Sequence, residues 1–346
     1  MKVKTFAGNP FEMGRMQGEI YRRNGLDFKN LNIDNELFEG QRYIYNKYYP
    51  EFLERLRGVA EGGKFEEDKL IYSFITGELR FFRKVSSQKQ QCTIFGVKND
   101  NGAFVGRNYD WYPVAEKFFE VYRLRDPEKN AFIGITDMLV ADSRDTKPFA
   151  YAPEDTLNDK GLYMGLTFAH RNAHGFGLSN LHILELIAQN CDTVEGALRT
   201  FEEIPVCTPK NFFIADKTGD MAVVEHAFDK FRILRPENGV LIQTNHYTDP
   251  ELKKYDEVFL RYPKHNTLLR YNEVRNKIMA NKEKLDRADI IKILGKAGSC
   301  VCQNDKYTRT IWSISIDTKR QDYTLYWDLL GKRKKTSSYL LSSGSV

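Results

Sequence analysis

The chain of 346 residues is long enough for one large domain or two medium ones. Its formal net charge of +5, without a long basic block, argues against a nucleic-acid-binding surface. No apolar run approaches the roughly 18 residues of a membrane span, the N-terminus lacks the apolar segment of a secretory signal, and five cysteines at irregular spacing argue against a disulfide framework. The composition therefore predicts a cytoplasmic protein.

The N-terminal part of the chain has the pattern of helices. Asn9, Pro10 and Glu12 have the spacing of an N-cap, a first helical residue and a capping-box partner. Apolar residues recur with a helical period over residues 35–59 and again over 66–83, which predicts two further helices there.

Strands replace helices at Cys92. The segments 92–97 and 103–111 are strand-like, and the intervening "KNDNG" is a strong hairpin signal. Similar strand-like runs follow along the chain, at residues 118–124, 149–152, 161–168, 211–216, 221–227, 231–235, 240–247, 310–317 and 323–329.

Two helical segments, 178–204 and 250–296, interrupt these strands. In the first of them, Asp192 and Glu195 have the spacing of a capping box for its second half. Strands joined mostly by turns, before and after helical inserts, predict an α+β fold with layered antiparallel sheets.

The predicted hairpin brings the end of its second strand back beside Cys92. If Val97 pairs with Ala103 across the loop, Cys92 and Asp110 share one face of the hairpin. Arg107 then points to the opposite face, although a shift of one residue or a bulge exchanges these assignments. In either register the arginine and the aspartate lie near the cysteine.

A cysteine near an arginine and an aspartate has the composition of a nucleophilic site. Thiolates attack acyl groups, and a nearby cation lowers the pKa of a thiol. The missing group is a general base, because none of the six histidines lies in a thiol-protease signature. Cleavage between Gln91 and Cys92 would free an α-amine with an ordinary pKa of about 7.7–8.0, which Asp110 could hold in place as the base.

The segment "CTIFGVKNDNGAFVGRNYDW" also resembles the start of the mature chain in N-terminal-nucleophile (Ntn) hydrolases. It is most similar to the acyl-CoA:6-aminopenicillanic acid acyltransferase-like group, with bile salt hydrolases and penicillin V acylases as more distant relatives. Further resemblances cover nearly the whole chain, in "GNPFEMGRMQG", "NDKGLYMGLT", "NFFIADKTGDMAVVEH", "LIQTNHY" and "RTIWSISID". The resemblance implies a four-layer αββα sandwich, self-cleavage before the cysteine, and hydrolysis or transfer of an acyl group through an acyl-enzyme.

The resemblance also implies roles for individual residues. In chain order these are the nucleophile, a nearby arginine, the aspartate that orients the new amino terminus, the oxyanion-hole amide and a late arginine: Cys92, Arg107, Asp110, Asn245 and Arg309. One departure is Gln91, because the penicillin acyltransferases of this group are cut after glycine. A bulkier residue could slow processing, since the scissile peptide must be strained for an N-to-S shift.

The sequence thus predicts a self-processing thiol amidohydrolase or acyltransferase that acts on a linear amide (an N-acyl compound) or an acyl thioester. Residues 1–91 would form a helical pro-segment, or small chain, packed on a catalytic core of residues 92–346. We expect a small-molecule acyl substrate, no cofactor, no metal, no nucleic acid and no membrane insertion, and leave homo-oligomer formation open. The alternatives are an uncleaved, non-catalytic relative that binds acyl ligands, and a thiol protease that pairs Cys92 with His246.

Overall fold

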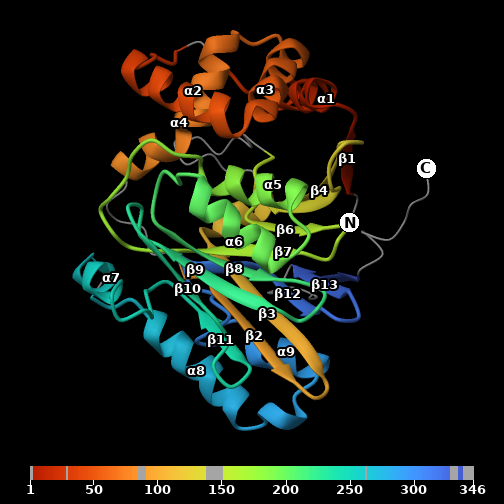
Figure 1. Ribbon diagram of the computed structural model, residues 1–346, viewed down its shortest axis with the longest axis vertical. Helices are drawn as coiled ribbons and strands as arrows, with labels where there is room; N and C mark the ends of the chain where they lie inside the picture. The colour runs from red at the N-terminus through yellow and green to blue at the C-terminus, as the bar shows by residue number, and fades with distance from the viewer. Residues whose placement is uncertain are drawn as a thin grey trace.

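Two stacked β-sheets form the centre of the protein, and helices cover both outer faces (Figure 1). The computed structural model describes residues 3–28, 30–84, 91–137, 151–261, 263–327 and 334–337. Among these residues, no helix combines the length and the apolar character needed to cross a bilayer.

The larger sheet has the strand order β1-β4-β5-β6-β7-β8-β9-β10. These strands are β1 (Lys4–Ala7), β4 (Glu120–Arg125), β5 (Phe132–Thr136), β6 (Asp155–Asn158), β7 (Tyr163–Phe168), β8 (Lys210–Ala215), β9 (Met221–His226) and β10 (Phe231–Leu234). β1 and β4 are parallel, and the other neighbours are antiparallel.

The smaller sheet is antiparallel and has the order β11-β2-β3-β12-β13-β14. Its strands are β2 (Thr93–Asn99), β3 (Gly102–Trp111), β11 (Val240–Gln243), β12 (Arg309–Asp317), β13 (Asp322–Trp327) and β14 (Lys334–Ser337). The predicted hairpin, β2–β3, therefore lies inside the sheet, between β11 and β12.

Apolar side chains fill the three spaces between four layers. Ile94 and Val105 of the smaller sheet meet Phe213 and Val223 of the larger one, and further clusters lie under the helices on each outer face. The helices over the larger sheet are α5 (Asn180–Asn190) and α6 (Val194–Glu203), and those over the smaller sheet are α8 (Thr267–Met279) and α9 (Arg287–Leu294). The short helical elements are η1 (Pro113–Lys117), η2 (Lys253–Tyr255), α7 (Val258–Arg261) and η3 (Lys282–Lys284). The predicted αββα sandwich is confirmed.

Four helices lie between β1 and β2 in the chain and are found at one end of the sandwich (Figure 1). They are α1 (Pro10–Arg23), α2 (Asn35–Tyr48), α3 (Pro50–Gly63) and α4 (Glu67–Lys84). The predicted capping box of α1 is present, with Asn9 Oδ1 accepting from Glu12 N at 2.9 Å. The prediction of a single helix over 35–59 is wrong, because the chain forms two helices there and Pro50 is the first residue of the second. Proline lacks an N–H group and moves the preceding residue out of the helical region, so α2 ends before it.

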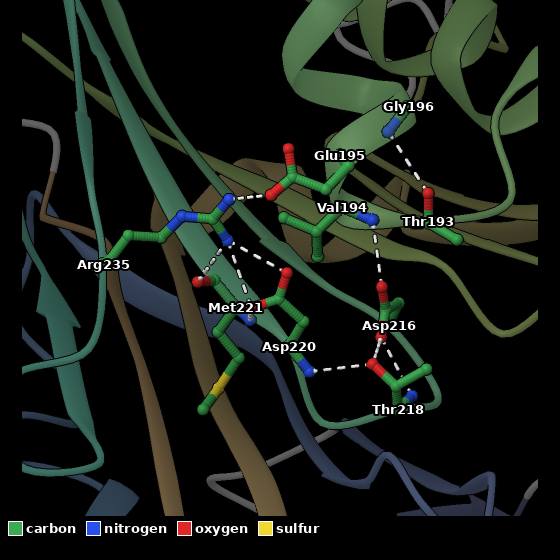
Figure 2. Close-up of polar contacts among 9 residues, drawn as sticks. All are labelled: Thr193, Val194, Glu195, Gly196, Asp216, Thr218, Asp220, Met221 and Arg235. Carbon is green, nitrogen blue, oxygen red and sulfur yellow. Dashed lines mark hydrogen bonds and ion pairs between the residues drawn. The ribbon is translucent and has the colours of Figure 1, made fainter.

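The start of α6 also differs from the prediction. Thr193, rather than Asp192, is the N-cap, and its Oγ1 accepts a hydrogen bond from Gly196 N at 3.2 Å (Figure 2). Figure 2 shows that Glu195 instead points to Arg235, with which it forms an ion pair. The prediction of a capping box at Asp192 and Glu195 is therefore wrong. Glu195 instead connects α6 to the segment after β10 through its ion pair with Arg235.

Buried polar contacts join the N-terminal helices to α5 and to the segment that leads into it. Arg55 of α3 forms an ion pair with Glu185 of α5, and both side chains are almost fully buried. The amide of Gln41 in α2 exchanges two hydrogen bonds with the main chain of Gly177, at 3.0 and 3.1 Å. Glu78 of α4 accepts a hydrogen bond from the main-chain N–H at the start of α5, at 2.8 Å. The interface is thus polar and specific as well as apolar.

Candidate active site

The topology of the smaller sheet brings four strand ends together. Cys92 immediately precedes β2, and β3 returns antiparallel to it. β12 pairs with β3 so that Arg309 lies opposite Trp111, and β11 pairs with β2 so that Gln243 lies opposite Ile94. The starts of β2 and β12 and the ends of β3 and β11 therefore meet at one end of the sheet, which is where the predicted site residues lie.

The hairpin register differs by one residue from the prediction. Ala103 pairs with Lys98 rather than with Val97, across a tighter turn. Because side chains alternate between the faces of a strand, this shift places Arg107 on the face that points to the other sheet, with Cys92. Asp110 lies on the opposite face, so the prediction that it shares a face with Cys92 is wrong.

The thiol of Cys92 is fully buried and lies beside the end of β3. Its Sγ atom is 3.8 Å from the main-chain oxygen of Asp110. Burial raises the pKa of this thiol to about 11, although Arg107 lowers it. In the uncut chain the thiol is therefore protonated at neutral pH, and the activation by Arg107 that the sequence suggests is outweighed by desolvation.

Asp110 keeps one carboxylate oxygen available. Its Oδ1 accepts a hydrogen bond from Thr310 at 2.5 Å, while its buried Oδ2 has no hydrogen-bond partner among the described residues. Burial raises the pKa of Asp110 to about 7, although Arg270, the bond from Thr310 and Arg107 lower it. A buried acceptor without a partner is costly, so this oxygen is suited to receive a donor that the uncut chain does not present.

Asn245 follows β11 and is fully buried. Its main-chain N–H donates to Thr267 Oγ1 at 2.9 Å. In its side chain, Nδ2 donates to the main-chain oxygen of Phe168 at 3.1 Å, and Oδ1 accepts from Arg270 at 2.9 Å. The amide is thus held in one orientation and retains one N–H for a further acceptor.

Arg270 of α8 is a site residue that the sequence analysis missed. Its guanidinium donates to the main-chain oxygen of Cys92, to Thr93 Oγ1 at 2.9 Å and to Asn245 Oδ1 at 2.9 Å. Its position on the helix could have indicated a buried role, because the buried face of α8 consists of Thr267, Arg270, Val274 and Ile278. A charged residue in the apolar stripe of a helix points to a specific partner in the interior.

Arg107 belongs to a buried network behind the thiol. Its Nε donates to both carboxylate oxygens of Asp155, at 3.1 and 3.2 Å. Trp312 Nε1 and the Tyr163 hydroxyl also donate to Asp155, each at 2.8 Å. Arg107 thus forms a buried ion pair with Asp155, and its positive charge also lowers the pKa of the Cys92 thiol.

Arg309 lies at the edge of the site. It is paired in the sheet with Trp111, and its guanidinium forms an ion pair with Glu116 of η1 at 2.6 Å. About a quarter of its side chain is exposed, at 27%. Within the described ranges, Arg309 therefore contacts residues at the edge of the site, and none of these contacts joins it to Cys92.

His246, the base in the alternative thiol-protease hypothesis, is occupied by other groups. Its Nδ1 lies 3.0 Å from Thr244 Oγ1 and 2.9 Å from Thr267 Oγ1, and its ring packs against Tyr271. Burial lowers the pKa of His246 to about 4, with a further contribution from Arg270. These contacts favour a structural role for His246.

A further buried carboxyl, Glu154, was not predicted. Burial raises its pKa to about 8, with a contribution from Asp137, and its Oε2 has no hydrogen-bond partner among the described residues. The charge of the same carboxyl also raises the pKa of the Cys92 thiol. Within the described ranges, no three His, Cys, Asp or Glu side chains gather as they would around a metal ion.

The fold and the site together define a layered α+β protein with a buried thiol, carboxyl and amide at one end of its smaller sheet. The chain belongs to the acyl-coenzyme A:6-aminopenicillanic acid acyl-transferase family, whose sequence model matches residues 97–329. The resemblance inferred from the motifs is thereby confirmed. The match begins five residues after Cys92, so it includes Arg107, Asp110, Asn245 and Arg309 but not the cysteine itself.

Several solved structures have a similar fold at low sequence identity. A variant of the conjugated bile acid hydrolase from Clostridium perfringens is 16% identical over 71% of this chain and 92% of that chain, with a TM-score of 0.49. Penicillin V acylase from Agrobacterium tumefaciens is 17% identical over 71% and 85% of the two chains, with a TM-score of 0.44. The N-acylethanolamine-hydrolyzing acid amidase ortholog of Caenorhabditis elegans is 12% identical over 66% and 93%, with a TM-score of 0.46. A comparison with curated proteins gave no match.

Proposed function

We propose that the protein is a self-processing enzyme that transfers or hydrolyses acyl groups through a thioester on Cys92. The observation that supports this most strongly is the meeting of Cys92, Asp110 and Asn245 at one end of the smaller sheet, where Arg270 contacts both the cysteine and the asparagine. The family name points to an acyl thioester as donor and an amine as acceptor. N-acyl compounds and acyl thioesters are accordingly the proposed substrates.

The first proposed step is cleavage of the chain before Cys92. The thiol attacks the carbonyl carbon of Gln91, and collapse of the intermediate moves the acyl group from nitrogen to sulfur. Water then hydrolyses this thioester, which leaves a carboxylate on Gln91 and a free amine and thiol on Cys92. We expect the new ammonium to donate a hydrogen bond to the buried Oδ2 of Asp110, which has no partner among the described residues.

In the proposed catalytic cycle this amine is the general base. It takes the proton of the Cys92 thiol, and the thiolate attacks the acyl carbonyl. Asn245 donates its remaining N–H to the oxyanion, as preorganised amides do in acyl transfer. The ammonium returns the proton to the leaving group, and water or an acceptor amine then attacks the thioester and regenerates the thiol.

Intact mass spectrometry of the purified protein tests this proposal. We expect two chains that end at Gln91 and begin at Cys92, because the proposed base is absent from the uncut chain. Incubation with a panel of acyl-CoA and N-acyl amine compounds, followed by acid quench, should add one acyl group to the chain of residues 92–346. An uncut protein that binds these compounds without any covalent adduct would instead support the non-catalytic alternative.

We further propose that residues 1–91 remain bound to the core as a small chain after cleavage. Arg55→Met leaves the buried Glu185 charge without its partner, and breaking a buried ion pair in this way costs about 3–5 kcal/mol. The expected result is a lower midpoint of chemical unfolding and loss of the small chain on gel filtration.

Arg57→Met is the matched control, because Arg57 lies on the same helix but pairs with Glu54 at the surface. Its effect should stay within about 0.5 kcal/mol. Adding Glu185→Gln to Arg55→Met should recover part of the lost stability, since the remaining charge is removed. Equal effects of the two arginine substitutions would show that the buried pair does not hold the segment.

A further inference from the structure

We infer that Arg270 is a positioning residue for acyl transfer, because it fixes the Cys92 main chain and sets the orientation of the Asn245 amide with the same guanidinium group. This inference rests on the proposed function. It adds a residue from outside the smaller sheet, carried by α8, to the groups that determine where the nucleophile and the oxyanion donor lie.

The partners of Arg270 are unusual for a fully buried arginine. Within the described ranges its guanidinium donates only to neutral oxygens, those of Cys92, Thr93, Asn245 and Asn266. A buried cation without a directly bound carboxylate is costly. The arrangement is suited to a site in which negative charge is held nearby or develops during the reaction.

The negative charges that Arg270 can stabilise belong to the candidate site. Arg270 lowers the pKa of Asp110, and Asp110 and Cys92 are the groups that most oppose the effect of burial on the pKa of Arg270. Ionised Asp110, the Cys92 thiolate and the oxyanion would each be stabilised by this cation.

Arg270 and the Phe168 carbonyl together set which end of the Asn245 amide is available as a donor. Because Oδ1 accepts from Arg270, the amide nitrogen faces the Phe168 carbonyl and keeps a free N–H. Without the guanidinium, Oδ1 loses its donor and only the bond to the Phe168 carbonyl holds the amide, so its free N–H would be less firmly oriented toward the developing oxyanion. An oxyanion hole depends on a donor that is already oriented before the reaction.

The contact with Cys92 persists through both stages of the proposed chemistry. Arg270 binds the carbonyl oxygen of Cys92, which stays in the peptide bond to Thr93 after the bond to Gln91 is cut. One side chain therefore holds the backbone of the nucleophile in the uncut chain and in the mature enzyme. Among the hydrogen bonds of the described residues, no other side chain binds both the Cys92 carbonyl and the Asn245 amide.

The test compares Arg270→Gln and Arg270→Lys with Arg275→Gln, an exposed arginine on the same helix, after each variant is processed. We expect Arg270→Gln to lower kcat by about 10- to 100-fold with a smaller change in KM, as for loss of an oriented oxyanion donor. Arg270→Lys should also lower kcat, because an ammonium group cannot replace the fork that reaches both partners. Arg275→Gln should match the wild type.

The pH profile separates the charge of Arg270 from its geometry. The charges of Arg270 on α8 and of Arg107 on its own strand act on Asp110, the Thr310 hydroxyl of β12 donates to it, and after cleavage the Cys92 ammonium is expected to join them. Removing the Arg270 cation raises the pKa of Asp110, so activity in Arg270→Gln should be lost at a higher pH as the pH falls. Arg270→Lys keeps the cation and should keep the acid limb of the wild type.

A double-mutant cycle with Asn245→Ala gives the deciding comparison. If Arg270 acts through Asn245, Arg270→Gln should lower kcat much less when Asn245 is already alanine. Fully additive effects, a wild-type kcat in Arg270→Gln, or failure of both Arg270 variants to fold would overturn the inference. A wild-type protein that neither cleaves nor forms a thioester would instead refute the proposed function itself.

Discussion

The Cys92→Ala protein is expected to remain a single uncut chain and to form no covalent acyl-enzyme. Alanine offers no nucleophile for attack on the Gln91 carbonyl, so neither the N-to-S shift nor the later thioester can form. Intact mass spectrometry after prolonged incubation reports the first result, and acid quench after incubation with the best substrate of the wild type reports the second. Cys92→Ser should be cut slowly, if at all, since a hydroxyl is a weaker nucleophile than a thiol.

Cys300→Ala is the control for this experiment, because Cys300 is the exposed member of the five cysteines. It should be cut and active like the wild type. If Cys92→Ala is cut between Gln91 and Cys92 as completely as the wild type, another protease makes the cut and self-processing is wrong. A thioester that persists in Cys92→Ala would move the nucleophile to another cysteine.

The hairpin shows what the sequence could and could not predict about the site. Its existence and its location followed from "KNDNG" between two apolar runs. The register did not, because Asn99 pairs with Gly102 and its side chain accepts hydrogen bonds from Asn101 N and Gly102 N, at 2.9 and 3.2 Å. These local contacts tighten the turn and exchange the faces of Arg107 and Asp110.

Three strands of the larger sheet, β1, β5 and β6, were not predicted, and for β6 the reason differs from that of the hairpin. β6 has the sequence "DTLN", whose composition is typical of a turn. It is a buried strand because distant groups satisfy its polar side chains: Asp155 binds Arg107, and Asn158 Nδ2 donates to the main-chain oxygens of Ala188 and Cys191, at 2.9 and 2.7 Å. The neighbouring β5 was not predicted either; half of the strand predicted at 149–152 lies outside the described residues, and residues 151–152 are not in a strand.

The spacing of residues along the sequence could not predict how deeply the Cys92 thiol is buried. The proximity of Arg107 to Cys92 was predicted correctly, but the expected decrease of the thiol pKa took account of the nearby cation and not of burial. The structure buries the thiol completely, and this raises its pKa to about 11. The role of Arg270 was equally hidden, because 178 positions separate it from Cys92 along the chain.

Asn245→Ala, once cut, is expected to form the thioester at Cys92 but to turn over slowly. The structure holds the amide with Oδ1 on Arg270 and one N–H on Phe168, so the other N–H is oriented before any substrate binds. Loss of such an oxyanion donor costs about 10²–10³ in kcat, with a smaller effect on binding. Rapid acid quench and mass measurement detect the thioester, and steady-state assays give kcat and KM.

Asn245→Ala must first be shown to be cut, because self-cleavage passes through a tetrahedral intermediate of its own, on the Gln91 carbonyl, and can draw on different donors. Unfolding midpoints separate lost catalysis from lost folding, since the substitution also leaves Arg270 without one acceptor. Asn272→Ala, an exposed asparagine on α8, is the matched control and should keep the wild-type kcat. If cut Asn245→Ala turns over at the wild-type rate, the oxyanion is held elsewhere and Asn245 only shapes the turn after β11.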